Sequence, residues 1–162
     1  SDAAKLKVLR KLILYWDGQW FLKVVDRYGL EEAIALNSRV RTSFGRIEMR
    51  TMLQTLGKEK AEGLENALRI VATYGQVLVG TRVKSEYFTR GRQARVTVNA
   101  CAAYEGARSA GLSRADQACV ACETLWQAWL ETLLPGRAIT VDYPLRLGKG
   151  DARCEFVITA AE

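Results

Sequence analysis

Apolar side chains recur every three to four residues along the first 75 positions, which is the spacing of amphipathic helices. The first predicted helix spans about 4–28, and its apolar face consists of Leu9, Ile13, Trp16, Trp20 and Val24. The same spacing predicts two further helices over about 30–56 and 59–74. Gly29, Gly57 and Gly75 follow the three helices as stop signals.

The pattern changes after position 76, where β-branched, aromatic and charged residues alternate with a period of two. Residues 77–99 predict a β-hairpin that turns at Arg90-Gly91-Arg92. Residues 139–147 and 153–159 predict a second hairpin around Gly148-Lys149-Gly150-Asp151.

Two helices are predicted between the hairpins, one over about 101–110 and one that continues to Leu134. The second helix is expected to begin at Ser113, an N-cap residue with Asp116 three positions later. Helices packed on one face of two antiparallel hairpins define an α+β fold. We expect a single domain over 1–162, with a helical front part over 1–75 and a hairpin–helix–helix–hairpin part over 76–162.

Charge and composition narrow the expected partners. The chain has 24 Lys and Arg against 18 Asp and Glu, for a net charge of +6, and the basic residues are mixed with acidic ones. This distribution favours solubility and does not single out nucleic acid. No apolar run approaches the ~20 residues that span a bilayer, and no signal-peptide layout is present. We therefore expect a cytoplasmic protein without a membrane partner.

The presence of four cysteines and the absence of histidine restrict the catalytic and metal-binding chemistry of this chain more than any other feature of its composition. The cysteines are Cys101, Cys119, Cys122 and Cys154. Without histidine, Ser-His-Asp triads, Cys-His dyads and His-containing zinc sites are excluded. If the four thiolates converge, they would form a tetrahedral zinc site or hold an iron–sulfur cluster. Buried inert thiols and a nucleophilic cysteine remain as alternatives.

Cys119 and Cys122 form a C-x-x-C pair. With Ser113 as the cap, Cys119 is expected in the second turn of its helix, away from the helix N-terminus that lowers a thiol pKa in redox motifs. The same helical face continues with Trp126, Trp129 and Leu133, so the pair also fits a buried apolar seam.

The candidate catalytic residues are Cys101, Glu105 and Glu48. Glu105 follows Cys101 by one helical turn and is therefore within reach of it. A carboxylate makes a good base only when burial raises its pKa, and a solvated helix face is the alternative for Glu105. Glu48 adjoins the apolar stripe of Ile47 and is the best candidate for a partly buried carboxylate.

The candidate ligand-binding residues are Trp16, Asp17, Trp20, Tyr104 and Trp126. Aromatic rings with one carboxylate suit a flat apolar ligand that carries a cationic or donor group. For the first helix, the alternative is that the aromatic residues pack against another helix while Asp17 faces solvent. Arg41, Arg46 and Arg50 are candidates to pair with acids elsewhere or to recognise a carboxylate.

Two stretches resemble known families. The segment "RLGKGDARCEFVI" is similar to the Gly-Asp-x-x-Cys-x-Phe signature of the 4-vinyl reductase domains, matched by Gly150, Asp151, Cys154 and Phe156. The helical front, "YWDGQWFLKVVDRYGLEEAIALNSRVRTSFGRIEMRTMLQTLG", resembles an uncharacterised bacterial and archaeal family related to L-2-amino-thiazoline-4-carboxylic acid hydrolase. The first resemblance implies an α+β domain with a buried small-molecule pocket, and zinc held by Cys and Glu in some sensor relatives. The second implies opening of a small cyclic C–N bond.

Three functions remain open on the sequence. The first is a small-molecule-binding domain with its pocket between the helical front and the sheet, beside a cysteine-ligated zinc or iron–sulfur site. The second is a hydrolase that opens a small cyclic amide-like substrate, and the third is a structural module with inert cysteines. The expected partners are an aromatic or carboxylate-bearing small molecule and a second copy of the chain.

Overall fold

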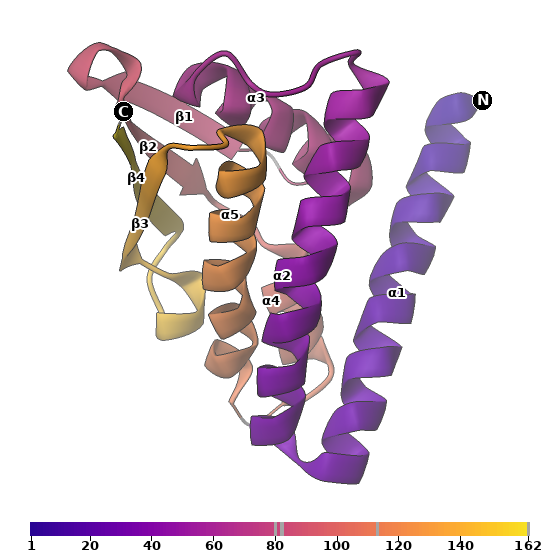
Figure 1. Cartoon of the computed structure of the whole chain (residues 1–162). Coiled ribbons are helices and arrows are strands. Elements are labelled where there is room, and N and C mark those ends of the chain that lie inside the picture. Colours follow the sequence, from indigo (N-terminus) through magenta and orange to yellow (C-terminus); the bar gives the residue numbers. More distant parts are fainter. Residues whose placement is uncertain (80, 82, 113, 162) are drawn as a thin grey trace.

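The computed structural model describes residues 1–79, 81, 83–112 and 114–161 (Figure 1). It confirms the predicted α+β class. The helices are α1 (Asp2–Tyr28), α2 (Leu30–Thr55), α3 (Leu64–Tyr74), α4 (Ala102–Ser109) and α5 (Val120–Leu133), and the strands are β1 (Val83–Phe88), β2 (Gln93–Val98), β3 (Ala138–Leu145) and β4 (Cys154–Ala161). Within the described residues, no helix combines the length and the apolar character required to cross a membrane.

The strands form one antiparallel sheet with the order β1-β2-β4-β3. The two predicted hairpins are therefore both present, and they join where β2 pairs with β4. The first begins at Val83 rather than at residue 77, because Gly75–Val79 form a π-helical turn. Val96 lies opposite Phe156, and Val98 lies opposite Cys154. Alternation along β2 buries Ala94, Val96 and Val98, as expected for a strand with one face on a core.

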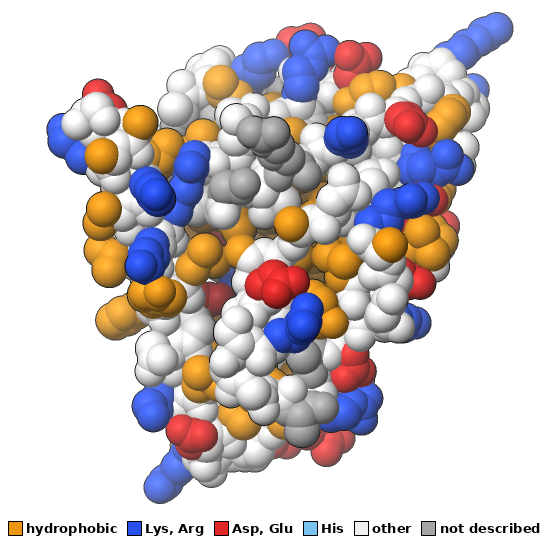
Figure 2. All heavy atoms as spheres, turned by 180° about the vertical axis from the view of Figure 1, so that it is seen from behind, with side chains coloured by type: hydrophobic (Ala, Val, Ile, Leu, Met, Phe, Trp, Pro, Cys, Tyr) orange, Lys and Arg blue, Asp and Glu red, His pale blue; other side chains and the backbone are white. Residues whose placement is uncertain are grey.

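The core lies between this sheet and a layer of helices. Figure 1 shows α5 between the sheet and α2, with α1 on the far side of α2. The fully buried side chains include Met49, Leu64, Leu68, Leu130, Leu133 and Ile158. By contrast, α1 buries none of its residues, and hydrophobic side chains are visible along the edge that it forms, on the left of Figure 2.

Two predicted helix starts were wrong. The third helix begins at Leu64, because residues 57–63 form a loop whose Ala61 N–H donates to the Leu133 carbonyl at 2.8 Å. The last helix begins at Val120, after a 3₁₀ turn over Ala115–Cys119. Such tight turns often precede α-helices. Ser113, the predicted cap, lies outside the described residues.

Candidate functional site

The four cysteines come from three places in the fold and lie beside the turn between β3 and β4. Cys101 stands at the N-cap of α4, Cys119 at the N-cap of α5, Cys122 in the first turn of α5, and Cys154 at the start of β4. All four are free thiols, and each lies within electrostatic range of the others. The four thiols therefore share one region of the fold.

Two successive backbone amides point at two of these sulfur atoms. The Leu147 N–H donates to Cys154 Sγ at 3.3 Å, and the Gly148 amide lies close enough to Cys119 Sγ to lower the pKa of that thiol. A Cβ atom on residue 148 would lie only 2.7 Å from Cys119 Sγ and 3.2 Å from the Cα of Asp116. Glycine at 148 is what allows the turn to approach the thiols this closely.

Burial keeps the thiols of Cys119, Cys122 and Cys154 protonated. Burial, followed by the neighbouring Cys101 and Cys154, raises the pKa of Cys119 to about 11, although the Gly148 amide and Arg146 lower it in part. Burial also raises the pKa of Cys122 and of Cys154. Cys119 lies at the helix N-terminus rather than in the second turn as predicted, yet desolvation outweighs the helix dipole there. A nucleophilic thiolate at neutral pH is therefore disfavoured at these three positions.

The cluster is not arranged as a metal centre in this structure. Across the described parts of the chain, no three or more Cys, Asp or Glu side chains are placed to hold a metal ion together. The zinc or iron–sulfur site at Cys101, Cys119, Cys122 and Cys154 remains a prediction.

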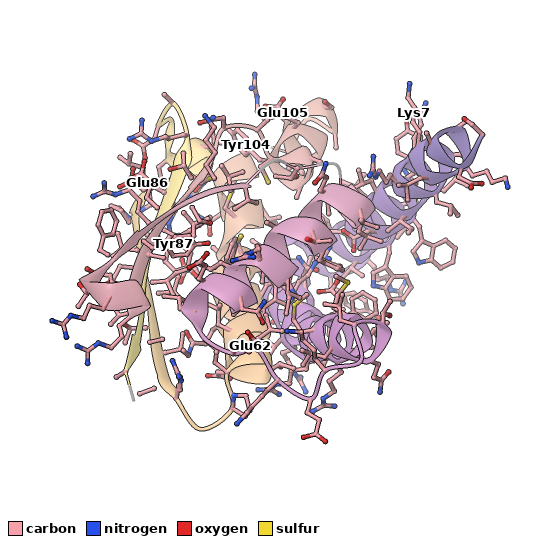
Figure 3. The ribbon with its side chains drawn as sticks, turned by 90° about the horizontal axis from the view of Figure 1, so that it is seen from above. Lys7, Glu62, Glu86, Tyr87, Tyr104 and Glu105 are labelled. Carbon is pink, nitrogen blue, oxygen red and sulfur yellow. The ribbon has the colours of Figure 1, made fainter. Side chains whose placement is uncertain are left out.

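The carboxylates proposed as bases lie in contrasting environments. Glu48 is only 7% exposed, which confirms its predicted burial. The Tyr74 hydroxyl donates to one of its oxygens, and Trp129 Nε1 donates to the other at 2.7 Å. Glu105 is exposed on α4, where it pairs with Arg108 at 3.6 Å (Figure 3). The solvated alternative for Glu105 is therefore the one observed.

The structure does not bring the five predicted ligand-binding residues together. Trp16 is 79% exposed and Trp20 61% exposed on α1, whereas Trp126 is 4% exposed in the core. Asp17 forms an ion pair with Arg41 of α2, so its carboxylate does not simply face solvent as the packing-seam alternative expected. Tyr104 lies on α4 beneath the Arg108 guanidinium (Figure 3).

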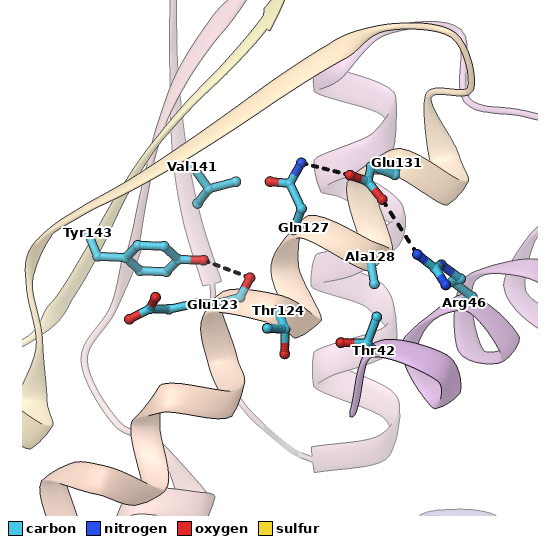
Figure 4. Close-up of a pocket in the computed structure, with 9 residues that line it drawn as sticks. All are labelled: Thr42, Arg46, Glu123, Thr124, Gln127, Ala128, Glu131, Val141 and Tyr143. Atoms are coloured by element: carbon cyan, nitrogen blue, oxygen red, sulfur yellow. Dashed lines mark hydrogen bonds and ion pairs between the residues drawn. The ribbon is translucent and has the colours of Figure 1, made fainter. Parts of the chain in front are cut away.

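A groove of about 430 Å³ opens between α2, α5 and β3 (Figure 4). It is lined by Thr42, Arg46, Glu123, Thr124, Gln127, Ala128, Glu131, Val141 and Tyr143. Gln127 Nε2 donates to Glu131 at 2.9 Å, while Arg46 Nη2 lies 3.9 Å from the same carboxylate. Arg46 and Glu131 are both about half exposed, so a ligand can reach the two charges.

Arg146 links this groove to the thiol cluster. Its guanidinium pairs with Glu123 and lies 4.7 Å from the centre of the Tyr143 ring. Among the described residues, Arg146 Nε is a buried side-chain nitrogen with no hydrogen-bond partner. Burial, reinforced by the neighbouring Cys122 and Glu123, raises the pKa of Tyr143, so its hydroxyl stays neutral and donates to the Glu123 carbonyl at 3.1 Å.

Sequence reasoning missed Arg146, Gly148 and Tyr143. The sequence predicts Gly148 only as part of a turn, although its lack of a side chain also leaves room for Cys119. Arg146 and Tyr143 carry no motif, and their roles depend on how β3 packs against α5. By contrast, the sequence does identify Arg46 as a candidate carboxylate-binding residue.

The architecture is that of an α+β fold shared with several solved structures. The phenol-responsive sensory domain of the transcription activator PoxR, solved with phenol, superposes with a TM-score of 0.65 at 14% identity, over 91% of this chain and 74% of that one. Trafficking protein particle complex subunit 3 from Naegleria fowleri, covalently bound to palmitic acid, gives 0.66 at 11% identity, over 96% and 97%. An H-NOX protein from S. oneidensis in the Fe(II)NO state gives 0.52 at 9% identity, over 88% and 72%. At these identities the likeness concerns the fold alone.

The chain belongs to a family of unknown function, DUF6125, whose profile matches residues 3–103. A search of curated proteins gave no match. Neither the family nor these structures supports the expected relationship to the 4-vinyl reductase domains or to L-2-amino-thiazoline-4-carboxylic acid hydrolase.

Proposed function

We propose that this chain is a small-molecule-binding domain and that its ligand occupies the groove between α2, α5 and β3. The groove volume of about 430 Å³ suits a small organic ligand. The three fold neighbours are described with phenol, palmitic acid and nitric oxide, so this architecture accommodates small molecules in other proteins. The observation that carries the proposal is the loosely paired Arg46–Glu131 couple at the groove.

These two charges indicate the class of ligand. A guanidinium binds a carboxylate through two parallel hydrogen bonds, and Arg46 is free to turn because its ion pair is long. A ligand amine would then take the place of Arg46 beside Glu131, which otherwise keeps only the hydrogen bond from Gln127. The apolar part of the ligand would contact the apolar wall of the groove, which is formed by Ala128, Val141 and the Tyr143 ring. The ligand is a small amino-carboxylate with an apolar or aromatic body.

Calorimetric titration with a panel of aromatic and aliphatic amino-carboxylates tests this proposal, with phenol and palmitate as comparison ligands. Arg46→Gln is expected to weaken binding by about 10–100-fold, because a charge-assisted hydrogen bond contributes about 1.5–3 kcal/mol. Arg39→Gln is the matched control, since Arg39 is exposed on the same helix outside the groove. No binding across the panel, or equal affinity in Arg46→Gln, would contradict the proposal.

We also propose that the four-thiol cluster binds a soft metal ion, either zinc or the iron of an iron–sulfur cluster. Support comes from four thiols that three segments bring together, with the amides of residues 147 and 148 close to two of them. Hydrogen bonds to sulfur favour the thiolate form that a metal requires. Such an ion would hold α4, the start of α5 and β4 together by displacing the thiol protons.

Protein purified without oxygen separates the outcomes for the cluster. Stoichiometric zinc supports a thiolate site, and iron with sulfide and visible absorption supports an iron–sulfur cluster. Either metal should fall well below stoichiometry in Cys154→Ser, while a Ser109→Ala control keeps it. Metal-free protein that fails to take up added zinc would overturn this second proposal and leave the groove proposal intact.

A further inference from the structure

The helical hairpin of α1 and α2 presents large apolar side chains that no other described segment buries. We define the α1–α2 apolar face by these exposed residues: Val8, Leu9, Leu12, Ile13, Tyr15, Trp16, Trp20, Leu36, Val40, Phe44 and Ile47. Trp16 is 79% exposed and Leu12 is 59% exposed. Much of this face lies along the edge occupied by α1, where Figure 2 shows hydrophobic side chains at the surface.

The exposed apolar residues of the two helices lie at the same height along the axis of the helical hairpin. On α2, residues 36, 40, 44 and 47 recur at helical spacing, as do residues 9, 12, 16 and 20 on α1. Antiparallel helices joined at Gly29 align residues that are equally distant from it. The ion pair between Asp17 and Arg41, each twelve positions from Gly29, confirms this alignment. The stripes therefore occupy the same length of the molecule.

The charged side chains within this stretch of α1 already have partners in the same chain. Arg10 Nε donates to the Val77 carbonyl at 2.6 Å, Lys11 Nζ lies 5.5 Å from the centre of the Tyr15 ring, and Asp17 pairs with Arg41. The α1 part of the face is consequently apolar, and its charged side chains are engaged within the chain. A helix that lies on an anionic membrane instead keeps its cations free beside its apolar stripe.

The exposed area matches the requirement of a stable subunit interface. With about 150–250 Å² for each large aromatic side chain, the exposed parts of these residues amount to about 1,000 Å². A standard interface buries about 800 Å² on each partner, whereas a typical monomer exposes no apolar patch beyond about 300–600 Å².

We infer that a second copy of this chain covers the α1–α2 apolar face through a two-fold contact. A two-fold interface uses the same patch on both subunits, so one apolar face is sufficient. If the axis passes near Leu12 and the two α1 helices run antiparallel, Trp16 of one copy lies level with Val8 of the other. Large and small side chains then alternate along the contact, with Trp16 as its main anchor.

Sedimentation equilibrium at increasing protein concentration tests the inference. The wild-type chain is expected to be a dimer, and Trp16→Lys is expected to be a monomer with an unchanged far-ultraviolet circular dichroism spectrum, because Trp16 makes little intrachain contact. Trp16→Ala should weaken dimerisation by more than tenfold. Tyr87→Lys is the control, since Tyr87 is exposed on β1, away from this face (Figure 3).

Two further measurements distinguish the other possible occupants. Acrylamide should quench the fluorescence of Trp16 and Trp20 more strongly in monomeric Leu12→Lys than in the wild-type dimer. A wild-type chain that stays monomeric at every concentration would overturn the inference, as would a dimer that Trp16→Lys leaves intact. Binding of monomeric wild-type protein to phosphatidylserine vesicles, lost in Trp16→Lys, would assign the face to a membrane surface and also overturn it.

Discussion

Replacing Glu48 by alanine is expected to destabilise the fold by about 4 kcal/mol, because it would leave two buried donors without an acceptor. Those donors are the Tyr74 hydroxyl and Trp129 Nε1, which meet the two carboxylate oxygens of Glu48. Burial, followed by the nearby Glu48 charge, raises the pKa of Tyr74, so this hydroxyl remains a donor at any ordinary pH. Each unsatisfied buried group costs about 1–3 kcal/mol.

Glu48→Gln separates the hydrogen bonds from the charge. Its carbonyl oxygen still accepts from one donor, while its amide nitrogen faces the other, so a loss of about 2 kcal/mol is expected. Urea denaturation measures both variants, and Glu59→Gln in the exposed loop after α2 is the control, with a change below about 0.5 kcal/mol.

A double-mutant cycle with Tyr74→Phe then tests the origin of the loss. The Tyr74→Phe change should cost much less in Glu48→Ala than in the wild type, because its hydroxyl has already lost its acceptor. If Glu48→Gln is more stable than the wild type, the cost of burying the charge exceeds the value of its hydrogen bonds, and the reasoning is refuted.

Three further predictions follow from the described contacts. Gly148→Ala should lower the melting temperature by an amount equivalent to about 1–3 kcal/mol, because the alanine Cβ would lie 2.7 Å from Cys119 Sγ. An unchanged melting temperature would show that the turn can move away from the thiol. Burial raises the Cys119 pKa from 9.0 to about 11, so the folded state holds the thiol proton more tightly than the unfolded chain does. The protonated thiol therefore contributes fully to stability below pH 9, and this contribution declines as the pH rises toward 11. Urea midpoints across that pH range should fall less steeply in Cys119→Ser, and parallel slopes would contradict this assignment. Arg41→Gln should cost less than about 1 kcal/mol in urea denaturation, because the Asp17 carboxylate that it pairs with is nearly half exposed; a loss of several kcal/mol would mean that this pair orients α1.

The order of the elements could be predicted from local signals. Periods of 3.6 and 2 residues distinguish the helical front from the two hairpins, and Gly29 and Pro135-Gly136 mark real ends of helices. The start of α5 could not be predicted in this way, because the 3₁₀ turn over Ala115–Cys119 packs against the distant turn at Gly148.

The candidate sites were only partly predictable. The residue types identified the four cysteines, the buried Glu48 and the carboxylate-binding potential of Arg46. Their neighbours could not be identified, because Arg146, Tyr143 and the amides of residues 147 and 148 meet these groups only after β3 folds back against α5.

Two tryptophans show most clearly what sequence alone determines. Trp16 and Trp126 both lie in apolar stripes at helical spacing, yet one is 79% exposed and the other is 4% exposed. Periodicity determines which face of a helix is apolar, because it reflects the geometry of one helix. Whether that face is covered depends on which other elements pack against it, and only the tertiary structure places the sheet over Trp126 and leaves Trp16 uncovered by the described residues.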